Sequence, residues 1–315
     1  MKIVIIGGTG HVGTFLVPRL VSAGHELTVV SRKQREPYLI HSAWQSVRRI
    51  SIDRSEAEKQ NNFGKQILDL DPDIVIDMIC FKSESVESLV PELYGKIQHF
   101  LLCGTIWIHG HSEQVPTDET QPRKPFGDYG IKKAEIESWL LSYSHLTGFP
   151  ATIIHPGHIV GPGWVPLNPA GNFNPDVYKK LAAGEELILP NLGLETIHHV
   201  HADDVAQAFE KAINNRSTAL GESFHAVSPK ALTLRGYAEA MAAWFGKDAH
   251  LSFLPWTEWK STVSEKDADA TWDHIAHSPN CSIEKARKLI NYQPRYTSLE
   301  AVQESIKYLF DNKTL

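Results

Sequence analysis

Residues 1–13 read Met-Lys-Ile-Val-Ile-Ile-Gly-Gly-Thr-Gly-His-Val-Gly, and this stretch predicts how the chain folds. The β-branched run at residues 3–6 is typical of a buried strand, and the pattern over residues 12–23 is that of a helix. The glycines between them permit a tight turn and a close approach of the backbone to a pyrophosphate, while the helix N-terminus supplies free N–H groups. An ordinary glycine turn is the alternative, but the strand before the run and the helix after it favour dinucleotide binding. The residues expected at the cofactor are Gly7, Thr9, Gly10, His11, Val12 and Gly13.

Strand and helix patterns continue to alternate beyond this loop. Strands are expected at residues 27–30, 47–52, 74–79, 100–103 and 151–155, and helices at residues 56–70, 84–94 and 129–145. Continuous apolar strands joined by helices predict an α/β fold, a Rossmann-type doubly wound parallel sheet. The alternation breaks down after residue 156, and a smaller C-terminal α/β substrate cap is expected there. Residues 1–165 would form the dinucleotide-binding domain, with a strand and helix near residues 196–214 returning to it, and residues 166–315 would form mainly the cap.

The composition argues against several classes of protein. The 315 residues carry a formal net charge of −6 and the longest basic clusters are pairs, so neither nucleic acid nor a membrane surface is expected as a partner. The three cysteines are far apart and lack metal-ligand spacing, which favours reduced thiols in a cytoplasmic protein. The apolar start is too short for a signal peptide or a membrane span.

The end of the second strand bears on the choice between NAD and NADP. An acidic residue there would bind the adenosine ribose hydroxyls of NAD, but the sequence reads Ser31-Arg32-Lys33. A hydroxyl and two cations can bind a 2′-phosphate, so we favour NADP over NAD. The alternative is that Arg32 and Lys33 are ordinary solvated side chains on the surface. Asp53 and Arg54 follow the third strand and are expected near the adenine, although Asp53 could equally cap the next helix.

A tyrosine–lysine pair opens the helix that follows the fifth strand. The spacing of four places Tyr129 and Lys133 on one face of that helix, where a lysine ammonium is expected to lower the pKa of the tyrosine and make it an acid/base. Thr105 follows the fifth strand, at the sheet edge where ligands bind in open α/β folds. Its hydroxyl is expected to hold the substrate oxygen. A pair of surface side chains is the alternative for Tyr129 and Lys133.

These motifs lie in an order that resembles the extended short-chain dehydrogenase/reductase family, the group of NAD-dependent epimerases and dehydratases. The resemblance includes the glycine loop, Thr105, Tyr129-Gly-Ile-Lys-Lys133, Pro156-Gly and Val200-His201-Ala-Asp203-Asp204. It implies that Thr105, Tyr129 and Lys133 are the catalytic set, that Lys133 also binds the nicotinamide ribose, and that Pro156 belongs to the cofactor site.

The sequence also departs from that family. Sugar-nucleotide 4,6-dehydratases place Asp-Glu directly after the threonine, but Ile106-Trp107 stand here, which argues against dehydration. The arginines with which the family's nucleotide-sugar epimerases clamp a diphosphate are missing near Ile197 and near residues 275–280, which argues against a nucleotide-diphosphate substrate. His158 stands where the family often has a substrate-binding asparagine.

The expected function is an NAD(P)-dependent oxidoreductase or epimerase that acts by hydride transfer on a hydroxyl or keto carbon of a sugar-like, polyhydroxylated small molecule. Trp107, His109 and His158 are the candidate substrate-binding residues. The chain has 16 histidines, but no closed ligand set emerges, so no metal is expected. A catalytically silent cofactor-binding regulator or an RNA-binding relative on the same fold is the alternative, and homodimer formation is left open.

Overall fold

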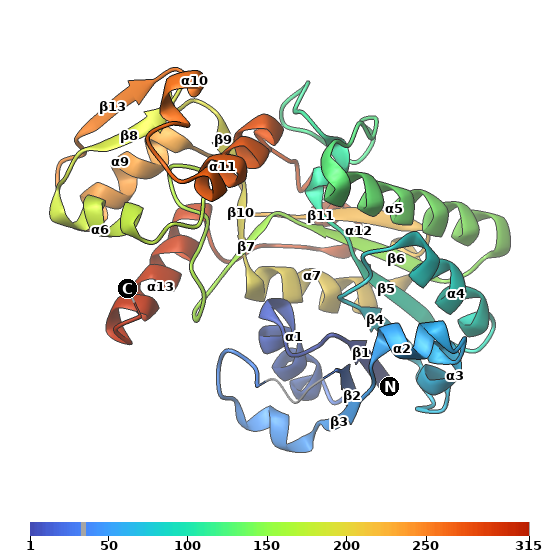
Figure 1. Ribbon diagram of the computed structural model, residues 1–315. Helices are drawn as coiled ribbons and strands as arrows, with labels where there is room; N and C mark the ends of the chain where they lie inside the picture. The colour runs from blue at the N-terminus through green and yellow to red at the C-terminus, as the bar shows by residue number, and fades with distance from the viewer. Residues whose placement is uncertain (33–35, 315) are drawn as a thin grey trace.

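Seven parallel strands form the central layer of the computed structural model, which describes residues 1–32 and 36–314 (Figure 1); the count refers to those residues. The strand order is β11-β6-β5-β4-β1-β2-β3. The bounds are β1 Lys2–Ile6, β2 Glu26–Ser31, β3 Arg48–Ser51, β4 Ile74–Asp77, β5 His99–Cys103, β6 Ala151–Pro156 and β11 Glu222–Ala226. The direction of winding reverses between β1 and β4, which opens a ligand-binding crevice at the carboxyl ends of these strands. The α/β fold class predicted from the sequence is confirmed.

Alternation along each strand divides the core between the two faces of this sheet. Ile3 and Ile5 of β1 pack with α1, α7 and α12 on one face, and Val4 and Ile6 pack with α3, α4 and α5 on the other. Both faces of the strands are therefore buried, as a parallel sheet requires. The helix bounds are α1 His11–Ser22, α2 Arg54–Lys59, α3 Phe63–Leu68, α4 Ser83–Leu93, α5 Gly127–Thr147, α7 Ala202–Asn214, α8 Arg216–Ala219 and α12 Glu284–Ile290, with 3-10 turns η1 Ser42–Ser46 and η2 Ile106–His109.

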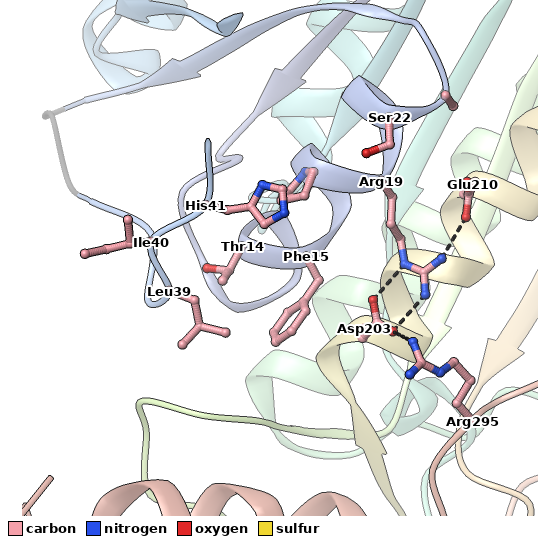
Figure 2. Close-up of a pocket in the computed structure, with 12 residues that line it drawn as sticks. Thr14, Phe15, Arg19, Ser22, Leu39, Ile40, His41, Asp203, Glu210 and Arg295 are labelled. Atoms are coloured by element: carbon pink, nitrogen blue, oxygen red, sulfur yellow. Dashed lines mark hydrogen bonds and ion pairs between the residues drawn. The ribbon is translucent and has the colours of Figure 1, made fainter. Parts of the chain in front are cut away.

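An ion-pair network holds α1 against α7 (Figure 2). Arg19 donates two hydrogen bonds of 2.7 Å to the carboxylate of Asp203 and one of 2.9 Å to Glu210, and Arg295 adds a bond of 3.1 Å to Asp203. Bidentate geometry and partial burial make such pairs stronger than exposed ones. A cavity of about 610 Å³ lies beside this network. It shares no lining residue with the two cavities described below, one at the glycine loop and one beside Thr105 and Tyr129.

A third apolar core lies in the cap, at one end of the main sheet (Figure 1). Within the described ranges, three two-stranded sheets accompany it: β7 with β10 and β8 with β13 are parallel, and β9 with β12 is antiparallel. The bounds are β7 His158–Val160, α6 Asp176–Ala183, β8 Leu187–Pro190, β9 Thr196–Ile197, β10 His199–His201, β12 Leu232–Thr233, α9 Leu234–Trp244, β13 Leu251–Leu254, α10 Trp256–Trp259, α11 Glu265–His277 and α13 Ser298–Asp311.

Some elements differ from the sequence prediction. The single helix expected over residues 56–70 is two helices, α2 and α3, separated where Asn61 takes a left-handed conformation with φ of 50°. The segment just after residue 156, where the alternation of strands and helices was expected to break down, contains β7. The strand near residue 199, β10, pairs with β7, whereas β11 joins the main sheet beside β6. Among the described residues, no helix combines the length and apolar character needed to cross a membrane.

Candidate active site

The glycine loop borders a cavity of about 530 Å³ at the carboxyl ends of the first strands. A hydrogen bond of 2.8 Å from the Gly7 backbone N–H to the Val30 carbonyl fixes the start of the loop against β2. Lining residues come from the loop, from the end of β2 and from the segments after β3 and β4. They are Gly7, Thr9, Gly10, Ser31, Arg32, Asp53 and Ile79.

Two glycines of this loop occupy positions that other residues cannot fill. Gly7 has a φ of 83°, and a Cβ there would lie 2.6 Å from the Cγ2 of Ile79. A Cβ on Gly13 would lie 1.8 Å from the carbonyl oxygen of Gly8. In addition, Gly10 caps α1 without a side-chain hydrogen bond, so the first N–H groups of α1 have no side-chain acceptor at the cap. Glycine backbone, a helix N-terminus and an open cavity together fit a dinucleotide pyrophosphate.

The residues expected to face the 2′-position of the adenosine ribose lie along the same cavity. Ser31 ends β2, and Arg32 after it is exposed; Lys33 lies outside the described residues. The Asp53 carboxylate accepts a hydrogen bond of 3.2 Å from the backbone N–H of Glu56, so it caps α2. The two roles that the sequence left open for Asp53 are thus compatible, because a capping carboxylate can also face the cavity.

Three other residues expected at the cofactor do not line this cavity. Arg54 is only 7% exposed, and its guanidinium donates bonds of 2.9 and 3.0 Å to the buried Asp77. Its placement at the adenine is corrected, because the buried carboxylate holds the guanidinium inside the protein. Val12, a buried residue of α1, packs in the core. Pro156 is buried at the end of β6.

Thr105, Tyr129 and Lys133 converge at the end of β5. Thr105 begins η2, where its Oγ1 accepts a bond of 3.3 Å from the backbone N–H of Trp107, and its hydroxyl lies near the Tyr129 phenol, whose pKa it lowers. Lys133 is 3% exposed, and its Nζ lies 5.9 Å from the Tyr129 ring centroid. The arrangement brings together the three residues that the sequence singled out.

The electrostatics of this trio differ from the sequence prediction. The Tyr129 side chain is 43% exposed, but loss of water around its phenol raises its pKa to about 12, helped by the nearby Cys103 thiol and opposed by the Thr105 hydroxyl. The Lys133 ammonium, which was expected to lower this pKa, instead donates bonds of 2.8 Å to the carbonyls of Cys80 and Cys103. Tyr129 is therefore protonated at neutral pH in this arrangement.

A second cavity, of about 550 Å³, lies beside Thr105 and Tyr129. Its wall combines the end of β5, the start of α5, the β7 segment and α11 of the cap. The lining residues are His11, Thr105, Ile106, Trp107, Tyr129, Gly157, His158, Ile159, Trp164, Val165, Leu167, Phe173 and His274. Two of the three candidate substrate residues, Trp107 and His158, line it. The predicted cofactor residue His11 lines this cavity rather than the first one.

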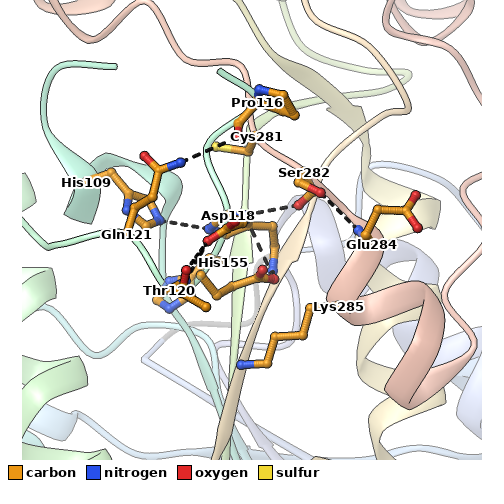
Figure 3. Close-up of polar contacts among 12 residues, drawn as sticks. His109, Pro116, Asp118, Thr120, Gln121, His155, Cys281, Ser282, Glu284 and Lys285 are labelled. Carbon is orange, nitrogen blue, oxygen red and sulfur yellow. Dashed lines mark hydrogen bonds and ion pairs between the residues drawn. The ribbon is translucent and has the colours of Figure 1, made fainter. Parts of the chain in front are cut away.

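His109 does not line this cavity and is corrected as a substrate residue. It is 6% exposed, and its Nε2 lies 2.8 Å from the Nε2 of His225 in β11. Burial lowers the pKa of His109 to about 4, with a smaller contribution from Arg123, so the ring is neutral at neutral pH. Figure 3 draws His109 among the polar contacts around Asp118, Gln121 and His155.

Residues 3–226 match the profile of the family described as NAD dependent epimerase/dehydratase. The chain belongs to this family.

Similar family members have different described roles. The chain is 26% identical to the chloroplast stem-loop binding protein of 41 kDa b of Arabidopsis thaliana, over 99% of this chain and 80% of that protein. It is 23% identical to the 2′-dehydrokanamycin reductase of Streptomyces kanamyceticus, over 87% of this chain and 76% of that one. The crystal structure of dTDP-glucose 4,6-dehydratase from Bacillus anthracis in complex with NAD superposes with a TM-score of 0.75 at 16% identity, covering 100% of this chain and 98% of that chain. The likeness in structure confirms the fold.

In this chain, a buried polar network of His155, Glu137 and Arg123 holds the backbone of Thr105 in place. The sequence analysis did not predict this network. The Nδ1 of His155 accepts a bond of 3.0 Å from the Thr105 backbone N–H, and its Nε2 lies 3.0 Å from the Glu137 carboxylate. Arg123 donates bonds of 2.9 and 2.8 Å to Glu137. Because Nδ1 accepts, Nε2 must carry a proton and donate, so the network fixes the tautomer of His155.

The same network closes the turn after β5. A Cβ at Gly104 would lie 2.2 Å from the Nδ1 of His155, so only glycine lets the turn pass this ring. Burial raises the pKa of Glu137, but the adjacent His155 and Arg123 outweigh it and hold this pKa well below its usual range. One signal was available in the sequence: Glu137 stands one turn after Lys133, on the face of α5 that points into the sheet.

The remaining histidines form no metal site in the described part of the chain, where no group of three or more His, Cys, Asp or Glu side chains could hold a metal ion. The rings of His198 and His199 are held by hydrogen bonds to backbone carbonyls. The Nε2 of His198 lies 2.8 Å from the Ser228 carbonyl, and that of His199 lies 3.1 Å from the Leu167 carbonyl.

Proposed function

We propose that the chain is an NAD(P)-dependent oxidoreductase or epimerase that transfers hydride at a hydroxyl or keto carbon of a small, polyhydroxylated, sugar-like molecule. The observation that carries this proposal is that Thr105 and Tyr129 lie together on the wall of the 550 Å³ cavity, with the Nζ of Lys133 5.9 Å from the Tyr129 ring centroid. Gly7, Gly10 and Gly13, with Ser31 and Arg32, would hold the dinucleotide. When bound, it would supply or accept the hydride.

The proton chemistry follows from the side chains. In the reduction direction the Tyr129 O–H bond breaks as its proton moves to the carbonyl oxygen of the substrate, while the Thr105 hydroxyl donates a hydrogen bond to the same oxygen. The Nζ of Lys133 lies 5.9 Å from the Tyr129 ring centroid, so its ammonium is the cation beside the phenolate that remains. With its pKa raised to about 12, Tyr129 already carries the proton that reduction requires, whereas oxidation must first remove it.

Substitution of Tyr129 tests the reaction. Tyr129→Phe should lower kcat by about 10²–10⁴, the usual contribution of a general acid/base, because it removes the transferable proton. Dinucleotide affinity, measured by fluorescence titration, is the control and should be unchanged. Unaltered turnover in Tyr129→Phe would contradict the proposal. Steady consumption of NADPH with a keto-sugar would identify a reductase, because an epimerase regenerates its cofactor.

Dehydration is disfavoured by the residues after Thr105. Ile106 is 3% exposed, and Trp107 stacks on His277 with ring centroids 4.1 Å apart. Neither can act as an acid, and none of the described residues that line the cavity is a carboxylate. We therefore propose reduction, oxidation or epimerisation rather than elimination of water.

A preference for NADP over NAD is part of the proposal. Ser31 and Arg32 line the dinucleotide cavity, and a guanidinium can bind a 2′-phosphate by donating hydrogen bonds to its oxygens. Arg32→Ala should weaken NADPH binding by about tenfold, the effect of one charge-assisted hydrogen bond, and leave NADH binding unchanged. Equal weakening of both dinucleotides would contradict the assignment.

Nucleic-acid binding is the second candidate function, favoured by the similarity to the stem-loop binding protein of Arabidopsis thaliana. The net charge of −6 and the converging Thr105, Tyr129 and Lys133 favour the enzyme. A gel-shift titration with a stem-loop RNA at two salt concentrations distinguishes the two. Salt-dependent binding together with an unaltered phenotype of Tyr129→Phe would favour the RNA-binding function.

We also infer a cytoplasmic location. The three cysteines, Cys80, Cys103 and Cys281, are free thiols, which is typical of a reducing compartment. Cell fractionation with an antibody against the protein tests this inference, and recovery from an oxidising compartment would contradict it.

A further inference from the structure

We propose that the cavity beside Thr105 and Tyr129 selects an uncharged, ring-bearing compound, a glycoside or cyclic ketone that carries neither phosphate nor carboxylate. The proposal deepens the proposed function, on which it rests for the identity of the reacting carbon. It concerns the rest of the substrate, which the cavity walls must recognise.

The first argument is the absence of formal charge on the walls. Among the described residues that line the cavity, none is Asp, Glu, Lys or Arg. Lys133 is the cation beside Tyr129, but it is buried and donates to two carbonyls, so it is not available to a substrate anion. A phosphate or carboxylate that entered this cavity would lose its hydrating water and find no cationic hydrogen-bond donor in exchange. Burying an unpaired negative charge in this way is unfavourable.

The second argument is that two of the imidazoles on the walls, those of His158 and His274, are neutral. Burial lowers the pKa of His158 well below its usual range, and the neighbouring His274 lowers it further. Burial also lowers the pKa of His274 to about 4. At neutral pH these rings can offer hydrogen bonds to hydroxyl or carbonyl groups, but they offer no positive charge to an anion.

The third argument is the rigid aromatic surface. Trp107 is held by stacking on His277, with an interplanar angle of 14°. Trp164 is held by stacking on His11 at a centroid distance of 3.8 Å, and its Nε1 donates a bond of 3.1 Å to the Ile159 carbonyl. Flat, pre-positioned indole faces pack well against a sugar or aryl ring, because little side-chain freedom is lost on binding.

One polar atom in the wall lacks a partner. Among the described residues, the Nε2 of His158 is buried and makes no hydrogen bond. Buried polar nitrogens are normally paired, so a ligand group is the natural partner for this one. A neutral hydroxyl or carbonyl oxygen suits an uncharged imidazole.

The test compares a neutral probe with the same probe carrying one phosphate group. Phenyl β-glucoside and phenyl β-glucoside 6-phosphate are titrated by calorimetry into the full-length protein saturated with NADPH, with UDP-glucose as a third ligand. The expected result is at least tenfold tighter binding of the uncharged glucoside than of either phosphate compound. Equal affinities, the reverse order, or no binding of any of the three would overturn the proposal.

Variants locate the effect in the cavity. Trp164→Ala should weaken binding of phenyl β-glucoside at least fivefold, whereas Trp272→Ala, on an exposed face of α11 outside the cavity lining, should leave it unchanged. Val165→Lys places a cation on the wall and should shift the preference toward the 6-phosphate at least fivefold. His158→Phe should weaken binding, and His158→Asn should restore part of it. Equal effects of Trp164→Ala and Trp272→Ala would contradict the assignment.

The outcome separates this inference from the proposed reaction. Tyr129→Phe keeps the ring and should keep the preference for the uncharged glucoside while losing turnover. Selective binding of uncharged rings without hydride transfer in the parent protein would refute the proposed function and leave this inference standing. Turnover of a phosphorylated sugar in preference to its neutral counterpart would support the function and refute the inference.

Discussion

Lowering the pH from 7.5 to 5.5 should strongly destabilise the protein, because it charges histidines that the fold holds neutral. His109, His198, His274 and His277 are buried, and burial lowers the pKa of each to about 4. In the unfolded chain their pKa is about 6.5. The unfolded state therefore binds more protons below pH 6.5, so stability is fully present above that pH and is lost as the pH falls toward 4.

The expected magnitude follows from these values. For one such group, proton binding by the unfolded chain costs about 1.3 kcal/mol between pH 7.5 and 5.5, and four groups cost about 5 kcal/mol. This loss is comparable with the whole unfolding free energy of a typical domain, about 5–15 kcal/mol. Urea unfolding followed by circular dichroism at the two pH values, at constant ionic strength, measures it.

A pair of variants assigns the effect to a particular ring. The Nδ1 of His198 accepts a bond of 3.0 Å from the Cys281 backbone N–H, and its Nε2 lies 2.8 Å from the Ser228 carbonyl, an arrangement available only to a neutral ring. His198→Gln should reduce the pH-dependent loss by about 1.3 kcal/mol. The control His250→Gln, at an exposed position, should leave the loss unchanged. A total loss below about 1 kcal/mol, or equal behaviour of the two variants, would refute the reasoning.

Substitutions at three further positions test other features. Gly13→Ala should abolish dinucleotide binding in a fluorescence titration, because its Cβ would lie 1.8 Å from a backbone oxygen, and retained affinity would contradict that steric argument. His155→Leu should lower kcat more than tenfold by releasing the Thr105 N–H, while His155→Asn, which keeps an acceptor, should recover part of it with KM unchanged; equal loss in both variants would indicate a merely structural role. Arg54→Met should lower the unfolding free energy by about 3–5 kcal/mol by leaving Asp77 unpaired, and NADPH affinity should persist, since Arg54 does not line the cavity.

The sequence predicts those features that local physics decides. The strand before Gly7 and the helix after Gly13 follow from hydrophobic period and glycine conformation, and the fold class and family resemblance drawn from them are confirmed. Thr105, Tyr129 and Lys133 lie together because strand ends meet at one edge of a parallel sheet. Their catalytic roles stay a prediction.

Contacts between distant segments account for most of what the sequence did not predict. β11 carries buried Ser and His side chains, so it lacks the apolar run of a buried strand. His225 is tolerated there because its backbone N–H donates to Glu119, 106 residues away, and its ring pairs with His109. The two-residue strands β9 and β12 are too short to show any period. Hydrophobic periodicity in the sequence does not predict strand pairs as short as these.

Acid sensitivity and substrate selection share one physical cause. The burial that keeps His274 neutral, and so removes positive charge from the cavity wall, is the same burial that makes the fold unstable in acid. Protonation of His274 would give the cavity an anion-binding charge only near pH 4, where the buried histidines have already lost their contribution to stability, and burial lowers the pKa of His158 well below its usual range as well. The preference for an uncharged ring should therefore persist at every pH at which the protein is folded, and an anion affinity that rises between pH 7.5 and 6.5 would contradict this link.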